Sequence, residues 1–299
     1  MKKRLLITVF TITAILLSGC SNTTNDMESS YLTGKSMGQI QQAEFILDTS
    51  LPDSPEEINF YTIIIPEFTT ESVETLGTKL GLTGEAGVIS SGTIVLSSED
   101  GNNTLRVYDT GRIEYYSKNG LFVLDADLTS YDDAALIATA FLEETGLWFS
   151  DVELEEVKVG GTVNTTPSHL LVQYRQYIDG IPLTGNGTAY AVRVGSGGKV
   201  VKATVRHIEL EFQRKIQTIG SAEACDSLMA GEGIYFSIPE IASEIIIDNV
   251  YLGYFIEPTM ETGDDVIPVY VFEGECLDVN GNYIEDFAAY VEAGTAKQG

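Results

Sequence analysis

Basic residues, histidine and cysteine are all scarce in this chain of 299 residues. Its 17 lysines and arginines stand against 44 aspartates and glutamates, which gives a formal net charge of -27. Such an acidic chain repels nucleic-acid phosphates and anionic lipid headgroups. We therefore expect no binding to nucleic acid. The charge favours solubility, and it leaves a basic protein or cations as charged partners that the composition permits.

The sequence patterns of common hydrolases are missing. The two histidines, His169 and His207, lie in strand-like runs far from any serine or cysteine motif. The chain contains no His-Glu-x-x-His helix motif for zinc and no Gly-x-Ser-x-Gly elbow for a nucleophile. Residues 278–282 offer oxygen ligands at alternate positions, as a calcium loop does, but the closing glutamate is absent. We predict a hairpin turn there, and a protein without catalytic residues, cofactor or metal that is not an enzyme.

Long apolar runs are confined to the start of the chain. Lys2, Lys3 and Arg4 precede an apolar run from Leu5 to Leu17. This run is too short to span a bilayer of about 30 Å as a helix, and a basic start before a short apolar core is typical of a secretory signal. We therefore predict a signal peptide over residues 1–19. Its removal takes three basic residues and no acidic ones, so the charge moves from -27 to -30.

The signal ends in Leu17-Ser18-Gly19-Cys20, which resembles the lipobox of bacterial lipoproteins. The resemblance implies that Cys20 carries acyl chains such as palmitate and becomes the first residue of the mature protein. Two or three acyl chains anchor a protein stably, whereas one is marginal. Residues 20–43 are polar and aperiodic, so we predict a flexible tether. We expect a lipid-anchored protein on the extracytoplasmic face of the cell membrane; the alternative is an ordinary signal with an incidental cysteine.

A helix followed by strands is the clearest pattern in the chain and occupies residues 129–213. Leu136, Ala140 and Phe141 fall on one side of a helix that ends at Gly146. From Val152 onward the apolar residues alternate with polar ones, which is typical of strands. Glycines between the strand-like runs supply the backbone conformations of tight turns. The pattern predicts a helix packed on an antiparallel sheet.

A similar order occurs on both sides of this central unit. Residues 44–128 contain a strand-like run, a helix from Thr70 and three further strands. Residues 214–299 contain a short helix, Ser221 to Ala230, and three strands: Glu244–Ile256, Val266–Cys276 and Phe287–Ala293. We therefore predict an α+β protein with three repeated helix-on-antiparallel-sheet units in tandem. One continuous α+β domain is the alternative.

Part of the central unit resembles a known family. The run from Tyr174 to Leu183, Tyr-Arg-Gln-Tyr-Ile-Asp-Gly-Ile-Pro-Leu, is followed by Gly198-Lys199-Val200-Val201, and together they resemble PepSY-type modules. These modules include extracytoplasmic regulators of the YycH/YycI type and propeptides of secreted metallopeptidases. The resemblance covers about a tenth of the chain. It implies a helix on a curved antiparallel sheet, as in cystatin-like domains. Ile267–Phe272 and Ala289–Gly294 resemble the last two strands of the same modules.

Three functions follow from these features. The anchor, the tether and the YycI resemblance predict a non-catalytic binding or regulatory protein that acts on a membrane or secreted protein. The lipobox replaces the spanning helix of YycI-type proteins, so contact between membrane helices is not its mechanism. The propeptide resemblance implies instead a peptidase inhibitor or chaperone. The third function is binding of a solute or envelope polymer, for which a cleft could be lined by Tyr174, Tyr177, Tyr251, Tyr254 and Tyr270.

Two cysteines remain besides Cys20. Cys225 lies on the predicted helix of the third unit and Cys276 lies late in a strand of the same unit. A disulfide between them is possible if their Cα atoms come within about 7 Å, and an extracytoplasmic location permits the bond. Two buried free thiols are the alternative.

Overall fold

The computed structural model describes residues 43–89, 91–120, 123, 127–163, 166–231, 235–236, 238–239 and 241–295. The predicted signal peptide, Cys20 and the tether as far as residue 42 lie outside these ranges. Of the residues in these ranges, 50% lie in strands and 17% in helices. None of the helices in the described ranges is both long enough and apolar enough to cross a membrane.

The described residues form three α-helices: α1 (Thr70–Lys79), α2 (Tyr131–Thr145) and α3 (Ser221–Met229). The start of α2 is capped by Ser130, whose Oγ accepts a hydrogen bond from the Asp133 N–H at 3.1 Å. Its end is Gly146, which adopts the left-handed conformation with φ of 77°. The predicted end of this helix at Gly146 is therefore confirmed. Its buried side differs from the predicted one, because Leu136 is 69% exposed whereas Ala134, Ala138 and Leu142 are buried.

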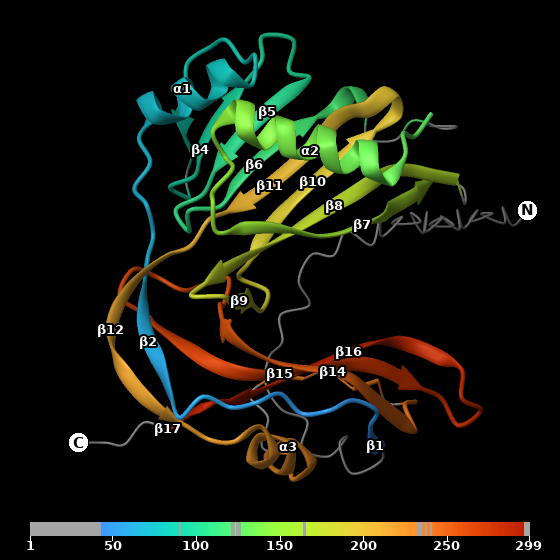
Figure 1. Cartoon of the computed structure of the whole chain (residues 1–299). Helices are drawn as coiled ribbons and strands as arrows, with labels where there is room; N and C mark the ends of the chain where they lie inside the picture. The colour runs from blue at the N-terminus through green and yellow to red at the C-terminus, as the bar shows by residue number, and fades with distance from the viewer. Residues whose placement is uncertain are drawn as a thin grey trace, which may run out of the picture. The chain divides into compact units, whose positions relative to one another are not determined.

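Eight of the described strands form an antiparallel sheet in the order β3-β4-β5-β6-β11-β10-β8-β7. Figure 1 shows α1 and α2 on one face of this sheet. The strands are β3 (Gly87–Val88), β4 (Ile94–Ser97), β5 (Asn103–Val107), β6 (Ile113–Ser117), β7 (Val152–Val163), β8 (Thr166–Ile178), β10 (Ala189–Gly195) and β11 (Lys199–Arg206).

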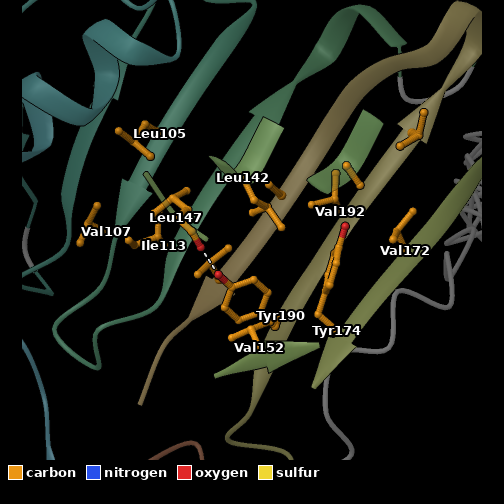
Figure 2. Close-up of a cluster of buried hydrophobic side chains, with 14 of the residues drawn as sticks. Leu105, Val107, Ile113, Leu142, Leu147, Val152, Val172, Tyr174, Tyr190 and Val192 are labelled. Carbon is orange, nitrogen blue, oxygen red and sulfur yellow. Dashed lines mark hydrogen bonds between the residues drawn. The ribbon is translucent and has the colours of Figure 1, made fainter. Parts of the chain in front are cut away.

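A hydrophobic core fills the space between α2 and this sheet (Figure 2). Leu142 of α2 is fully buried together with Val172 and Val192 of the strands. Each such aliphatic side chain contributes roughly 1.5–3 kcal/mol by leaving water. Tyr174 and Tyr190 pack edge to face with centroids 5.9 Å apart, and the Tyr190 hydroxyl donates a hydrogen bond to the Leu147 carbonyl. The Tyr174 hydroxyl lies 3.0 Å from Thr139 Oγ1, so both tyrosine hydroxyls have a hydrogen-bond partner within the protein.

The second sheet is built on three long antiparallel strands, β14 (Glu244–Phe255), β15 (Asp265–Leu277) and β16 (Tyr283–Glu292). Two short strands, β1 (Glu44–Leu47) and β9 (Ile181–Thr184), pair with β14 in parallel. The remaining strands are β2 (Glu57–Ile64), β12 (Glu209–Thr218), β13 (Tyr235–Phe236) and β17 (Gly294–Thr295). Helix α3 packs on this sheet, where Leu228, Phe272 and Phe287 form a second core.

The prediction of three repeated helix-on-sheet units in tandem is wrong, because the protein is a large mixed β-sheet with three helices in its described part. Strand pairing crosses the predicted boundaries between units. β6 pairs with β11, and β2 pairs with both β12 and β15. Unpaired strand edges expose backbone hydrogen-bonding groups. Here, strands that are distant in sequence pair with these edges and form hydrogen bonds with those groups. β9 pairs with β8 of the eight-stranded sheet and with β14 of the second sheet, so it joins the two into one continuous sheet. The parallel pairing of β1 and β9 with β14 makes this combined sheet mixed.

Buried Arg206 connects three distant segments of the chain. Its side chain is only 4% exposed. The guanidinium donates hydrogen bonds to the carbonyls of Thr110 at 2.9 Å, Gly187 at 3.0 Å and Glu257 at 3.1 Å. Burial, together with the nearby Arg112 charge, lowers the pKa of Arg206 to about 10, so it stays protonated at neutral pH. The charge is compensated by carbonyl dipoles, and Arg206 thereby joins β11 to the loop after β14.

Candidate functional site: a pocket beneath α1

A pocket of about 300 Å³ lies beneath α1, beside the end of α2. Gly146 ends α2, and Leu147 and Phe149, which follow it before β7 begins, form part of the pocket wall. The opposite wall comes from β6 and the end of β11. The lining residues are Pro66, Phe68, Ser72, Thr75, Leu76, Lys79, Gly111, Ile113, Thr145, Gly146, Leu147, Phe149, Val205, His207 and Glu209. We call this the α1–α2 pocket.

Apolar side chains supply most of the pocket wall, and Lys79 supplies one cationic group. The Lys79 ammonium donates a hydrogen bond to the Thr145 carbonyl at 3.2 Å, at the C-terminal end of α2. A cation at this end of a helix interacts favourably with the helix dipole. In the described part of the chain, Lys79 forms no ion pair with a carboxylate. Its remaining N–H groups are therefore available to a ligand.

His207 is fixed in the pocket wall by two contacts. Its ring stacks on Phe149, with centroids 3.7 Å apart and planes 14° apart. Its Nε2 lies 3.1 Å from Asp151 Oδ1. Gln176 donates a hydrogen bond to Asp151 Oδ2 at 2.8 Å and holds the carboxylate in turn. The sequence analysis found no partner for His207, because Asp151 lies in a different segment of the chain.

The hydroxyl groups in the pocket donate to helix carbonyls. Ser72 Oγ donates to the Thr69 carbonyl at 2.8 Å, Thr75 Oγ1 to Glu71 at 2.9 Å, and Thr145 Oγ1 to Phe141 at 2.7 Å. A hydroxyl nucleophile needs a base that accepts its proton, and these protons point into helices. The arrangement suits binding of a small molecule through an apolar surface and a few polar groups.

The other sequence-predicted residues lie elsewhere. His169 is buried in β8, with Nδ1 2.9 Å from Ser168 Oγ. Tyr174, Tyr254 and Tyr270 are buried in three different hydrophobic clusters, so they do not line a common cleft. Tyr251 accepts a hydrogen bond from Arg175 at 2.8 Å and donates one to Glu273 at 2.8 Å. None of these tyrosines lines the α1–α2 pocket, so the sequence analysis did not predict this pocket.

Both remaining cysteines belong to the core around α3. Cys225 and Cys276 are buried members of the same hydrophobic cluster, and both are thiols in the structure. Burial raises the pKa of Cys225, and it raises the pKa of Cys276 to about 11, so both groups are protonated at neutral pH. The disulfide between them stays a prediction.

Asp278 and Asn282 form the predicted hairpin turn, between β15 and β16. The Asp278 carboxylate accepts hydrogen bonds from the Asn280 and Asn282 backbone N–H groups at 2.8 Å and 2.9 Å. Its oxygens also accept from the Asn282 side-chain amide. Over the residues that the structure describes, no group of three or more histidines, cysteines or carboxylates is arranged to hold a metal ion.

The hydrogen bonds at this turn make the stability of the protein depend on pH. They come first from the Asn282 side chain, then from the backbone of Asn282 and Asn280, and they hold the pKa of Asp278 at about 2. The unfolded value is about 4, so the stabilisation is complete above pH ~4 and disappears as pH falls toward 2. We expect Asp278→Ala to lower the melting temperature at pH 7, with a difference from wild type that shrinks in acid.

Thermal melts followed by circular dichroism between pH 7 and pH 2 measure this effect. Val279→Ala is the control, because Val279 lies in the same turn, is 82% exposed and has no side-chain hydrogen-bonding group. A difference between Asp278→Ala and wild type that is equally large at both ends of the pH range would contradict the assignment.

Comparison with known proteins gives a fold neighbour and no family. No protein family model and no curated protein matches the chain. The crystal structure of an uncharacterized protein from Eubacterium rectale is similar, with a TM-score of 0.54 and 12% sequence identity. The similarity covers 85% of this chain and 90% of the other. At this identity the likeness concerns the fold alone.

Proposed function

We propose that the protein is a lipid-anchored, extracytoplasmic, non-catalytic binding protein that holds a small ligand in the α1–α2 pocket. The observation that carries the proposal is the pocket itself. Its volume of about 300 Å³ is at the lower end of ligand sites, and such sites are mostly apolar with a few polar groups. Lys79, His207 and Glu209 supply charged and polar groups here. The basic, apolar and lipobox-like segments before Ser21 support the anchor and the location.

Two threonines on α1 allow a matched test of the pocket. Thr75 and Thr78 are both exposed, and each donates its hydroxyl to the carbonyl four residues earlier at 2.9 Å. Only Thr75 lines the pocket. Replacement of either residue by tryptophan therefore changes the helix in the same way, but only Thr75→Trp places an indole at the pocket.

The probe is anilinonaphthalene sulfonate, an apolar fluorophore with one negative charge. We expect it to bind the wild-type protein with a blue-shifted emission. Thr75→Trp should weaken binding by about tenfold or more, equivalent to at least about 1.4 kcal/mol, and Thr78→Trp should leave it unchanged. Titrations of fluorescence against probe concentration measure the affinity of each variant for the probe. Equal binding by the two variants would show that the probe does not occupy the pocket and would count against the proposal.

Action on a membrane or secreted protein stays a prediction from the PepSY resemblance. This includes regulation of the YycI type and inhibition or chaperoning of a peptidase. The solute-binding alternative is the one that a described feature favours, although its site is the α1–α2 pocket and not the tyrosine-lined cleft of the sequence analysis.

A further inference from the structure

Three apolar side chains are strongly exposed at one end of the second sheet. Ile241 is 68% exposed, Val279 82% and Tyr283 56%. Single exposed apolar residues are common on soluble proteins, whereas a group at one site marks an interaction surface. Whether these three form a group depends on the strand pairing that surrounds them.

Ile241, Val279 and Tyr283 all lie near Leu277, at the end of β15. Leu277 pairs with Tyr283 across β15 and β16, and its carbonyl accepts a hydrogen bond from the Ser243 N–H at 2.8 Å. Ile241 precedes Ser243 by two residues, and Val279 follows Leu277 by two residues in the turn that Asp278 closes. We call Ile241, Val279 and Tyr283 the sheet tip.

The described chain begins at the same end of the sheet. The Glu44 N–H donates a hydrogen bond to the Ser243 carbonyl at 2.8 Å, and β1 pairs with β14 in parallel from Glu44 and Glu244 onward. β1 therefore starts at the sheet tip and runs away from it. Residues 20–43, which would connect Cys20 to β1, reach the fold at this end.

We propose that the sheet tip inserts into the interfacial layer of the membrane that holds the anchor, at a surface of zwitterionic headgroups without net charge. The inference rests on the proposed lipid anchor. Tyr283 suits this layer because its ring is apolar and its hydroxyl is polar. The hydroxyl donates to Asp286 at 2.9 Å. Anchoring raises the local concentration of bilayer around the tip, so a contact that is weak by itself becomes occupied.

The charges around the sheet tip determine which lipid headgroups it can contact. Exposed carboxylates of Glu44, Glu275, Glu285 and Asp286 lie on the strands that end there. An anionic leaflet repels these groups within a distance of about 10 Å. The tip therefore fits a surface of zwitterionic headgroups, and anionic lipid should weaken its insertion.

The test uses the lipidated full-length mature protein in phosphatidylcholine vesicles, with an environment-sensitive fluorophore on a new cysteine. Val279→Cys places it at the sheet tip. Val88→Cys is the matched control, because Val88 is also a strongly exposed valine, 63% exposed on β3 of the eight-stranded sheet. The native Cys225 and Cys276 are buried and protonated and should not be labelled.

We expect the label at position 279 to shift to shorter wavelength and to be quenched by lipid-attached nitroxides, and the label at position 88 to remain aqueous. Addition of phosphatidylglycerol should reduce the effect at position 279. An aqueous label at position 279 on protein that floats with vesicles overturns the tip proposal and leaves the anchor intact. Protein that does not float overturns both. A shift without vesicles that grows with protein concentration would assign the tip to a second copy and also overturn the proposal.

Discussion

Replacement of Cys20 by serine is expected to abolish acylation of the protein. Its thiol is the acceptor that the lipobox resemblance assigns, and a hydroxyl cannot form the thioether to the lipid. Metabolic labelling with palmitate should therefore fall from a strong signal to background. The mass of the N-terminal peptide of the mature protein should show acyl groups on the wild-type chain and none on the variant.

Ser21→Ala is the matched control for this experiment, because it changes the neighbouring residue and leaves the thiol in place. Its labelling should equal that of the wild type. Palmitate that remains on Cys20→Ser at the wild-type level would refute Cys20 as the acylation site. A wild-type chain without palmitate would refute the anchor, and with it the location and the membrane insertion of the sheet tip. The α1–α2 pocket would be unaffected, since its evidence is independent of the leader.

The largest expected effect on stability follows from Arg206→Met, which should lower the free energy of unfolding by about 3–5 kcal/mol. Methionine keeps much of the volume but cannot donate a hydrogen bond. The carbonyls of Thr110, Gly187 and Glu257 would each lose a charged donor at 2.9–3.1 Å. Burial of an unpaired carbonyl costs about 1–3 kcal/mol. Arg206→Lys should lower the free energy of unfolding by less than Arg206→Met does. Its ammonium can donate to some of these carbonyls but cannot reach all three segments.

Urea denaturation, monitored by tryptophan fluorescence, measures the change in the free energy of unfolding. Trp148 is the single tryptophan, and it packs on Tyr174 in the core beside α2. Lys199→Met is the control, since Lys199 lies on the same strand, β11, and is exposed. Its effect should stay within about 0.5 kcal/mol. A loss of less than about 1 kcal/mol for Arg206→Met would mean that the three carbonyls find other donors.

Local elements could be predicted wherever their own residues carry the signal. Helix α2 has an apolar stripe, a capping serine and a terminal glycine, all within its own segment. The long strands β14 and β15 are rich in β-branched and aromatic residues, which are typical of strands. β12, in contrast, is polar and mostly exposed, and it is a strand because β2 supplies its backbone partner. Nothing within its own segment indicates that pairing.

By itself, the sequence determined the leader that resembles a lipobox, the acidic surface and most of the helices and strands, because each depends on residues that are close together in the chain. Tertiary structure alone decided that the strands merge into one mixed sheet, that Lys79 and His207 line one pocket, and that Asp151 contacts His207. Backbone hydrogen bonding is the same for every strand, so the choice of partner follows from which edges remain unpaired once the cores have packed. That choice involves the whole chain at once.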